Sequence, residues 1–455
     1  MHTDVVILAA GQGSRMKSAL PKVMHPLAGK PMLQHVIDSA AKLNQAALHV
    51  VVGHGAELVR KQLEQQPVTI SLQAEQLGTG HAVAQALPAC QLDGVVLILY
   101  GDVPLIQVST LQALLQQAQQ GHLGLLTVEL LDPTGYGRIV RNAVKDVVAI
   151  VEHKDANEDQ RQIREVNTGI MAVPSQLLNS WLPQLSSENA QGEYYLTDII
   201  AMAAEEGIRI SAIQPTTEQE VQGVNNRQQL AELERWYQLQ QAKVLMAEGV
   251  TLFDPSRIDI RGDLSVGQDV VIDVNCVFEG HVVLADGVVI GPNCVIKNST
   301  LGVGTRIEAH SILDEAIVGS HAVIGPFARI RPGTQLADHT KIGNFVETKK
   351  AIIGEGSKVN HLSYIGDAVI GTEANVGAGT ITCNYDGVNK FSTQIGDGAF
   401  IGSNTSLVAP VSVGDNATVA AGSTITKDIP NGQLGVARGQ QKIVTHWQRP
   451  TKRQS

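Results

Sequence analysis

Residues 395–425 read IGDGAFIGSNTSLVAPVSVGDNATVAAGSTI and place an aliphatic residue at every sixth position. Residues 258–294 keep the same period, and a glycine often follows the aliphatic residue. A fixed short period over so long a stretch indicates a solenoid, in which each repeat packs on its neighbours. The residues in register are Ile258, Leu264, Val270, Cys276, Val282, Val288 and Cys294, then Ile395, Ile401, Leu407, Val413, Val419 and Ile425.

The period also predicts how the solenoid is built. Each hexad supplies one short strand and a turn, with its aliphatic residue in a narrow core and glycine at the corner. Three hexads close a triangular coil of about 18 residues, so about 180 residues predict roughly ten coils. The register drifts over residues 295–394, although Ile353, Val359 and Ile365 keep it locally. The pattern resembles the left-handed parallel β-helix of the hexapeptide-repeat family, and the left hand is implied by that resemblance alone.

Two of the four cysteines, Cys276 and Cys294, occupy hexad positions that are three hexads apart. We expect them to pack in the core, one coil above the other. Cys90 and Cys383 complete the set, and no pair has the CxxC spacing of a zinc motif. A disulfide framework is not expected in so long a chain.

The chain before the solenoid follows different rules. Residues 1 to about 225 alternate apolar strands, such as 5–10, 47–52 and 95–99, with amphipathic helical stretches such as 32–42. This alternation predicts a Rossmann-like α/β fold with a mainly parallel sheet, and ligands at the carboxyl ends of its strands. Residues 227–248 are rich in helix formers and contain no Gly or Pro, which predicts a linker helix about 33 Å long.

Composition excludes several functional classes. A formal net charge of -10 argues against a nucleic-acid surface. There is no basic segment before the first apolar stretch and no apolar run near the roughly 18 residues that span a bilayer, so we expect no membrane anchor and a cytoplasmic location. The basic tail Arg449-Pro450-Thr451-Lys452-Arg453 is expected to be a frayed, solvated end.

The first strand runs into a glycine-rich string, Leu8-Ala9-Ala10-Gly11-Gln12-Gly13-Ser14-Arg15-Met16, followed by Pro21-Lys22. Glycines let backbone N–H groups approach phosphate oxygens, and Arg15 and Lys22 can neutralise a triphosphate. The string lacks the Lys-Ser/Thr ending of a P-loop and the third glycine of a dinucleotide fingerprint.

This string resembles the sugar nucleotidyltransferase signature LxxGxGTRM followed by PK, with Ser14 in place of the usual Thr. The resemblance implies attack of a sugar phosphate on the α-phosphorus of UTP, with release of pyrophosphate and no protein nucleophile. Further matches follow in order: Gln73, Gly78-Thr79-Gly80, Tyr100-Gly101-Asp102, Gly135-Tyr136-Gly137-Arg138, Glu152, Asn167 and Gly223-Val224-Asn225-Asn226.

Asp102 follows a strand, where an acidic residue often does no more than cap a turn. Beside a phosphate loop, however, it is a candidate ligand for Mg²⁺, which prefers carboxylate and amide oxygens. The family places one carboxylate and one Asn on this ion, which match Asp102 and Asn225.

The solenoid could be a scaffold that only forms trimers, so the features that break its repeat matter most. Arg331 and Lys349 are three hexads apart and would stack at about 4.8 Å, which suggests an anion between or beside them unless the face is merely solvated. Ser403 and Ala421 have the same spacing and would line one edge. Residues 382–387, TCNYDG, interrupt the hexads and should protrude as a loop.

His361 is the candidate general base. A neutral imidazole can take a proton from an amine, and an alkyl ammonium cannot attack a thioester until it is deprotonated. Near an anion-binding Arg/Lys pair, this residue fits an acetyltransferase that acts on an amino-sugar phosphate.

From Leu8 to about Arg438, the chain closely resembles the family of bifunctional N-acetylglucosamine-1-phosphate uridyltransferase/glucosamine-1-phosphate acetyltransferases. The resemblance implies acetylation of glucosamine-1-phosphate by acetyl-CoA in the solenoid, then UMP transfer from UTP in the N-terminal domain. It further implies Mg²⁺, a homotrimer with the acetyltransferase site between solenoids, and a role in peptidoglycan and lipopolysaccharide synthesis. The implied domains are a uridyltransferase domain at 1–226, a linker helix at 227–248 and a β-helix acetyltransferase domain at 249–455.

The resemblance assigns each candidate residue a role. His361 is the general base, and the metal ligands are Asp102 and Asn225. The nucleotide and first sugar site comprises Leu8, Ala9, Ala10, Gly11, Arg15, Lys22, Gln73, Gly78, Thr79, Tyr100, Gly101, Asp102, Gly137, Glu152, Asn167 and Asn225. The second sugar phosphate contacts Arg331, Lys349, Tyr364 and Asn375, and acetyl-CoA contacts Ala378, Asn384, Tyr385, Ser403, Ala421 and Arg438. Asn360 receives no role.

The sequence is open to two other interpretations. A monofunctional nucleotidyltransferase with a trimerising solenoid predicts no acetyl-CoA turnover. A structural or ice-binding solenoid would need regular outward Thr ladders, which the sequence lacks, and would leave the phosphate loop unused.

Overall fold

The computed structural model describes residues 1–452 of the chain. They form two compact units, the first from Met1 to Tyr237 and the second beginning at Gln238. A 21-residue helix, α8 (Arg227–Ala247), crosses the border between them. None of the helices within the described residues is both long and apolar enough to cross a membrane.

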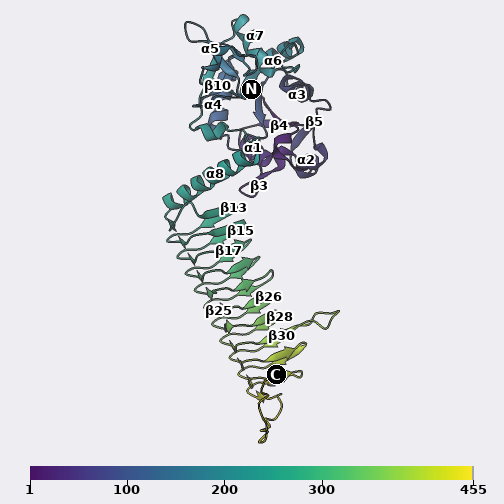
Figure 1. The fold of residues 1–455 in the computed structure, drawn as a ribbon, viewed down its shortest axis with the longest axis vertical. Helices are drawn as coiled ribbons and strands as arrows, with labels where there is room; N and C mark the ends of the chain where they lie inside the picture. The colour runs from purple at the N-terminus through teal and green to yellow at the C-terminus, as the bar shows by residue number, and fades with distance from the viewer. Residues whose placement is uncertain (453–455) are drawn as a thin grey trace. The chain divides into compact units, whose positions relative to one another are not determined.

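The first unit, which carries the labels α1 to α7 in Figure 1, is built on a nine-stranded sheet. Its main strand order is β11-β7-β10-β6-β1-β4-β5. Strand β1 pairs in parallel with its neighbours in this order, β4 and β6. The strands are β1 (Thr3–Ala9), β4 (Ala46–Val52), β5 (Val68–Leu72), β6 (Val95–Tyr100), β7 (Leu123–Glu129), β8 (Arg138–Arg141), β9 (Val147–Val151), β10 (Glu165–Pro174) and β11 (Ile210–Ile213), with a separate pair β2 (Pro26–Leu27) and β3 (Lys30–Pro31).

The predicted Rossmann-like α/β class is confirmed, although the sheet is not parallel throughout. β10 runs antiparallel to β6 and β7 on the main path. Off this path, β8 pairs antiparallel with both β10 and β9. The covering helices are α1 (Met32–Ala41), α2 (Ala56–Leu63), α3 (Thr79–Ala86), α4 (Val108–Gln119), α5 (Glu158–Arg161), α6 (Ser175–Trp181) and α7 (Ile199–Glu205). In α1, Leu33, Val36, Ile37 and Ala40 are buried at helical spacing, so a single face packs on the sheet.

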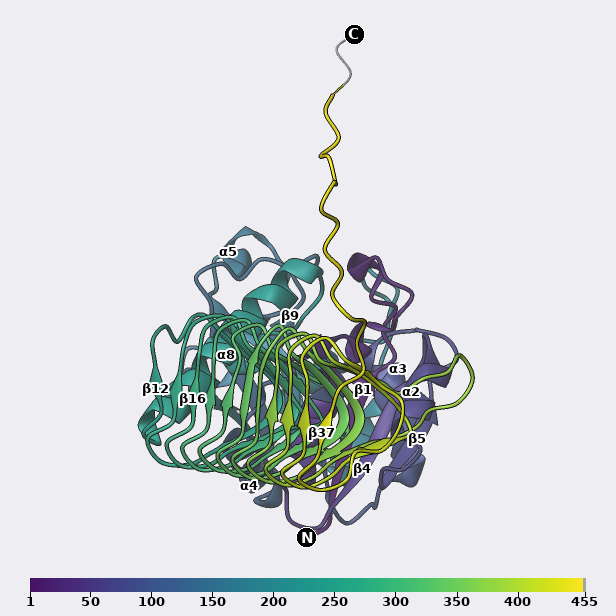
Figure 2. The ribbon, with the colours of Figure 1, turned by 90° about the horizontal axis from the view of Figure 1, so that it is seen from below.

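The second unit is a stack of parallel coils, shown one behind another in Figure 2. One face is an 11-stranded parallel sheet, which agrees with a β-helix-like solenoid; its left hand stays a prediction. The strands of this face are β12 (Thr251–Leu252), β14 (Val271–Ile272), β16 (Val289–Ile290), β19 (Arg306–Ile307), β22 (Val323–Ile324), β25 (Lys341–Asn344), β27 (Lys358–His361), β29 (Asn375–Val376), β32 (Phe400–Ile401), β35 (Thr418–Val419) and β37 (Leu434–Gly435).

The remaining strands of the solenoid join a second, 15-stranded sheet. They are β13 (Ile258–Val266), β15 (Cys276–Leu284), β17 (Val295–Lys297), β18 (Thr300–Leu301), β20 (Ile312–Asp314), β21 (Ile317–Val318), β23 (Arg329–Ile330), β24 (Gln335–Leu336), β26 (Glu347–Ile353), β28 (Tyr364–Ile370), β30 (Ile381–Cys383), β31 (Thr393–Ile395), β33 (Ser406–Val408), β34 (Val411–Val413) and β36 (Thr424–Ile425).

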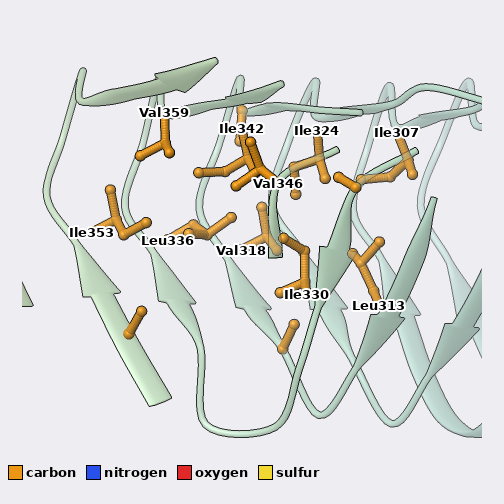
Figure 3. Close-up of a cluster of buried hydrophobic side chains, with 14 of the residues drawn as sticks. Ile307, Leu313, Val318, Ile324, Ile330, Leu336, Ile342, Val346, Ile353 and Val359 are labelled. Atoms are coloured by element: carbon orange, nitrogen blue, oxygen red, sulfur yellow. The ribbon is translucent and has the colours of Figure 1, made fainter. Parts of the chain in front are cut away.

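The core of the solenoid is a column of aliphatic side chains that point inward from successive coils (Figure 3). Full burial of one such side chain is worth about 1.5–3 kcal/mol. The predicted inward positions are buried, except that Leu264 is only partly buried at the edge of the core. Cys276 and Cys294 pack in this core as free thiols, as predicted, and burial raises their pKa to about 12 and about 11.

The drift over residues 295–394 has a simple origin, because the coils differ in length. Val283 pairs with Thr300, and Thr300 pairs with Ile317, so each of these coils is one residue shorter than three hexads. Arg329 pairs with Glu347 after a full three hexads, and Val369 pairs with Gln394 only after more than four. The inward positions are kept while their spacing in the sequence changes.

The longest coil carries a hairpin that leaves the stack between β30 and β31 (Figure 1). Its protruding part begins at Tyr385, which forms an antiparallel bridge with Lys390. The predicted start at residue 382 was wrong, because Thr382 and Asn384 are buried and Cys383 belongs to β30. Residues 449–452 of the basic tail are exposed, and Arg453 lies outside the described residues.

Candidate active sites

A cavity of about 510 Å³ opens at the carboxyl ends of β1 and β6, where a parallel sheet binds its ligands. Ten of the predicted nucleotide-site residues line it, together with Gln12, Gln76 and Glu193, to which the motifs gave no role. The ten are Leu8, Ala9, Ala10, Gly11, Lys22, Gln73, Gly78, Thr79, Tyr100 and Asp102. Gly101 lies beneath them, where its N–H donates to the Leu8 carbonyl at 2.9 Å.

The candidate metal ligands converge on one cationic side chain. The ammonium of Lys22 donates to the Asp102 carboxylate and, at 3.2 Å, to the side-chain oxygen of Asn225. Arg15 donates to the same Asn225 oxygen at 2.9 Å. Residues from positions 15, 22, 102 and 225 therefore meet at one edge of the cavity, which makes this a site where oxygen ligands and cations face a common point.

Tyr100 connects the cavity with further residues of the predicted nucleotide and first sugar site. Its ring lies against Gly169, where a Cβ atom would be only 2.5 Å from a ring carbon, and Gly169 has φ +85°. Glycine is therefore required there for both space and backbone conformation. Burial raises the pKa of Tyr100, and the nearby Asp102 and Glu152 carboxylates raise it further.

Three further residues of the predicted nucleotide and first sugar site lie close together: Gly137 precedes β8, Glu152 follows β9, and Asn167 belongs to β10. The Asn167 N–H donates to the Gly137 carbonyl at 2.8 Å. A Cβ atom on Gly137 would be 3.3 Å from a Glu152 carboxylate oxygen, so the glycine keeps this approach open. Thr197, which the motifs did not single out, donates to Glu152 at 3.3 Å.

Glu152 should make stability pH-dependent. Burial raises the pKa of its carboxyl above the ordinary 4.5, and Asp155, Asp198 and Glu193 add to this rise against the Thr197 hydrogen bond. The folded protein therefore resists ionising Glu152, and this group's stabilising contribution is lost as the pH rises through its folded pKa. Glu152→Gln should melt at a higher temperature than the wild type at neutral pH, with a gap that closes on acidification below 4.5. Melting curves recorded at several pH values measure this difference in melting temperature. Glu64→Gln, on the surface, is the control. A difference that does not change with pH would contradict the raised pKa of Glu152.

On the solenoid, His361 belongs to a column in which each residue sits one coil from the next. The column consists of Asn344, His361, Ala378, Ser403 and Ala421. The residue after each member donates its backbone N–H to the carbonyl of the preceding member: Leu362 to Asn344 at 3.1 Å, Gly379 to His361 at 3.2 Å, Asn404 to Ala378 at 2.7 Å and Gly422 to Ser403 at 2.8 Å. Arg438 closes the column, with its guanidinium donating to the Ala421 carbonyl at 2.8 Å. Four of the six predicted acetyl-CoA residues, namely Ala378, Ser403, Ala421 and Arg438, thus line up with His361.

Asn344 fixes the chemistry of the histidine. The two residues are paired across β25 and β27, and the Nδ1 atom of His361 is 2.9 Å from the Asn344 side-chain oxygen. An amide oxygen only accepts, so Nδ1 carries the hydrogen and Nε2 keeps a free lone pair. The exposed imidazole is therefore held in the tautomer that can accept a proton at Nε2.

Three cationic side chains lie near one another on the solenoid, outside this column. The Arg331 N–H donates to the Thr348 carbonyl at 2.9 Å, which places Arg331 one coil from Lys349. The ammonium of Lys390, from the hairpin, lowers the pKa of Lys349, and Arg331 acts in the same direction. Arg331 also pairs with Glu347 at 2.6 Å, so the protein supplies one carboxylate beside the predicted pair. Asn344, Glu347 and Lys390 were not assigned from the sequence.

The other predicted residues lie around these groups. Tyr364 pairs with Glu347 on neighbouring coils, and its hydroxyl reaches over Gly366. Asn375 begins β29, the strand after His361 on the same face. Asn384 donates to Asp367 at the base of the hairpin, while Tyr385 is exposed on it. The structure thus joins Asn384 to the stack and leaves Tyr385 outside it.

A further polar cluster lies at the opposite end of β1, where Asp4, His49 and Cys90 have side-chain ligand atoms within 4.8 Å of one another. Asp4 accepts from His49 at 2.8 Å and from the Gln91 N–H at 2.9 Å. Burial raises the pKa of Cys90 to about 12, which keeps the thiol protonated. We therefore assign this cluster a structural role.

Comparison with family models matches three parts of the chain. The model described as the MobA-like NTP transferase domain covers residues 5–165. The GMPPB C-terminal domain covers residues 260–344, and the hexapeptide repeat of succinyl-transferase covers residues 392–427. The matches fall on the α/β unit and on the solenoid.

Curated relatives match over nearly the whole length. A protein of Marinobacter nauticus named "Bifunctional protein GlmU" is 63% identical over 448 residues, which are 98% of this chain and 99% of the relative. Proteins with the same name from Stutzerimonas stutzeri and Cellvibrio japonicus are 60% and 61% identical, and each alignment covers at least 99% of both chains. A solved UDP-glucose pyrophosphorylase complexed with UDP-glucose is 18% identical, with a TM-score of 0.42, over 52% of this chain and 98% of that one.

Proposed function

The chain belongs to the family of bifunctional GlmU proteins, and from this premise we propose that its two units catalyse consecutive reactions. The solenoid acetylates glucosamine-1-phosphate with acetyl-CoA. The α/β unit then transfers UMP from UTP to N-acetylglucosamine-1-phosphate and releases pyrophosphate. The product, UDP-N-acetylglucosamine, serves peptidoglycan and lipopolysaccharide synthesis.

The column from His361 to Arg438 carries the proposal for the solenoid. Adjacent coils lie about 4.8 Å apart, so three coil steps from His361 to Ala421 span about 14 Å. This outward-facing line of small side chains suits an extended thioester arm with its reactive end at His361. A scaffold needs no such alignment of a tautomer-fixed histidine with small residues.

The acetyl transfer follows from these groups. The cations Arg331, Lys349 and Lys390 attract the phosphate of the amino sugar. His361 takes a proton from the amine at Nε2, the amine nitrogen forms a bond to the acetyl carbon, and the bond from that carbon to sulfur breaks. Of the two protons that the ammonium loses on becoming an amide, one protonates the departing thiolate to give free coenzyme A, and the other passes from His361 to solvent.

For uridyl transfer, the sugar phosphate is already an anion and needs no protein nucleophile. Its oxygen bonds to the α-phosphorus of UTP as the bond to the β-phosphate oxygen breaks, and Arg15 and Lys22 neutralise charge on the phosphates. Glu152 and Asn167 orient the sugar, while the glycine-rich loop at residues 8–16 holds the triphosphate. Catalysis is then positioning and charge neutralisation.

The residues present suit a divalent ion. The carboxylate of Asp102 and the amide oxygen of Asn225 already share one cation, the Lys22 ammonium, and both are ligand types that Mg²⁺ takes. We propose that these two side chains hold Mg²⁺, which when bound would neutralise charge on the triphosphate. Two predictions stay predictions: a homotrimer in which the loop predicted at residues 382–387 reaches a neighbouring subunit, and a cytoplasmic location.

The test is a two-stage assay on the purified chain. Glucosamine-1-phosphate and acetyl-CoA alone should release free thiol without pyrophosphate. Addition of UTP and Mg²⁺ should then release pyrophosphate, and omission of acetyl-CoA should suppress it. Pyrophosphate release from N-acetylglucosamine-1-phosphate without any thiol release in the first stage would favour the monofunctional reading.

Asn344→Ala should weaken the base without removing it. Loss of the Nδ1 partner frees the imidazole to rotate and to adopt the other tautomer, so acetyl transfer should fall by about tenfold to a hundredfold. Thiol release measures this, and Asn344→Asp, which keeps an acceptor, should retain more activity than Asn344→Ala. Equal rates for wild type and Asn344→Ala would contradict the role.

A further inference from the structure

Arg138 is a buried cation in the α/β unit that the reaction as described does not use. Only 1% of its surface is exposed, and its Nε atom has no hydrogen-bond partner within the described residues. Burial lowers the pKa of its guanidinium, against the opposing effect of the Asp132 carboxylate. Arginine nevertheless stays protonated in proteins, so this site holds a charge whose burial is costly.

The guanidinium joins two chain segments that flank Gly137 and Glu152, two residues of the proposed nucleotide and sugar site. One nitrogen donates to the Tyr136 carbonyl, immediately before Gly137. Another lies 3.3 Å from Nδ1 of His153, immediately after Glu152. Since arginine only donates, Nδ1 of His153 must be the acceptor in this contact.

The backbone of Arg138 is tied to a third residue of this site, Asn167. Arg138 pairs with Val151 on β9 and with Val166 on β10. These partners immediately precede Glu152 and Asn167. Through its two strand pairings and its guanidinium, Arg138 therefore contacts a neighbour of each of Gly137, Glu152 and Asn167, while lining no part of the cavity of about 510 Å³.

We propose that Arg138 is a positioning residue that fixes Gly137, Glu152 and Asn167 in the geometry that binds N-acetylglucosamine-1-phosphate. The inference rests on the proposed function of this unit. A simple packing role would need only an apolar side chain. The proposed role needs donors directed at both Tyr136 and His153, and we call this pair of guanidinium contacts the clamp. Loss of the clamp should weaken sugar binding and leave the nucleotide subsite, built on the residue 8–16 loop, unchanged.

The test compares Arg138→Ala with Arg138→Met, which fills the same space without donors. For both, the KM for N-acetylglucosamine-1-phosphate should rise by about tenfold to a hundredfold, because small displacements of positioning groups have effects of that size. The KM for UTP and the acetyl transfer of the solenoid should stay at wild-type values. Equal rises in both KM values, or no rise, would overturn the proposal.

Chemical rescue separates the guanidinium from the packing. Millimolar guanidinium chloride should lower the raised KM of Arg138→Ala, whose cavity can admit the ion, and should not lower that of Arg138→Met; sodium chloride is the salt control. Absence of rescue in Arg138→Ala would contradict the clamp.

His153 gives a second route that leaves Arg138 in place, in case its variants do not fold. His153→Gln keeps an acceptor and should bind sugar phosphate better than His153→Phe. Equal sugar-phosphate KM values for the two would contradict the clamp. Wild-type protein without any uridyl transfer would instead refute the proposed function, so the two failures are distinguishable.

Discussion

Replacement of His361 by alanine is expected to lower acetyl transfer by about 10²-fold or more, the usual scale for loss of a general base. The substrate amine is an ammonium ion until a base removes its proton, and the column offers this imidazole with its Nε2 lone pair free. Thiol release from acetyl-CoA measures the loss. Uridyl transfer from N-acetylglucosamine-1-phosphate should keep the wild-type rate.

His281→Ala is the matched control, because His281 is an exposed histidine of the same solenoid outside the column. It should retain full acetyl transfer. If His361→Ala acetylated as fast as this control, another group would have to be the base.

Asp102→Ala is expected to lower uridyl transfer by about 10³-fold. A bound divalent ion contributes several kcal/mol to phosphoryl transition states, and about 1.4 kcal/mol corresponds to a factor of ten in rate. Removal of the carboxylate also takes away the partner of Lys22. Pyrophosphate release measures the effect, and thiol release at the solenoid should be unchanged.

Asp93→Ala is the control for this variant, since Asp93 is an exposed carboxylate just before β6, at the opposite end of the strand from Asp102. It should retain both activities. A comparable loss of both activities in Asp102→Ala would refute separate sites.

The parts of the fold that depend on local pattern were predictable. The hexads identified the solenoid, the alternation of strands and helices identified the α/β unit, and the glycine-rich string identified the cavity lined by Ala10 and Lys22. The family resemblance stated from these motifs is confirmed by the full-length relatives. The antiparallel direction of β10 was not predictable, because the apolar pattern of a buried strand does not depend on whether it runs parallel or antiparallel to its neighbours.

On the solenoid, Asn344 escaped prediction because it is joined to His361 across a coil of irregular length. A coil of three full hexads would set Asn344 beside Leu362, whereas the actual coil is one residue shorter and pairs it with His361. The same effect hides the line from His361 through Ala378 to Ser403, since the hairpin lengthens one coil to more than four hexads. Arg331 with Lys349 and Ser403 with Ala421 were found because those coils keep three full hexads.

One mixing experiment tests most directly whether a single chain holds two independent sites. Asp102→Ala and His361→Ala are each given glucosamine-1-phosphate, acetyl-CoA, UTP and Mg²⁺, first separately and then together. Each variant alone should release almost no pyrophosphate, while the mixture should release it, because the acetylated sugar made by one variant is the substrate of the other. A mixture as inactive as its components would contradict the account.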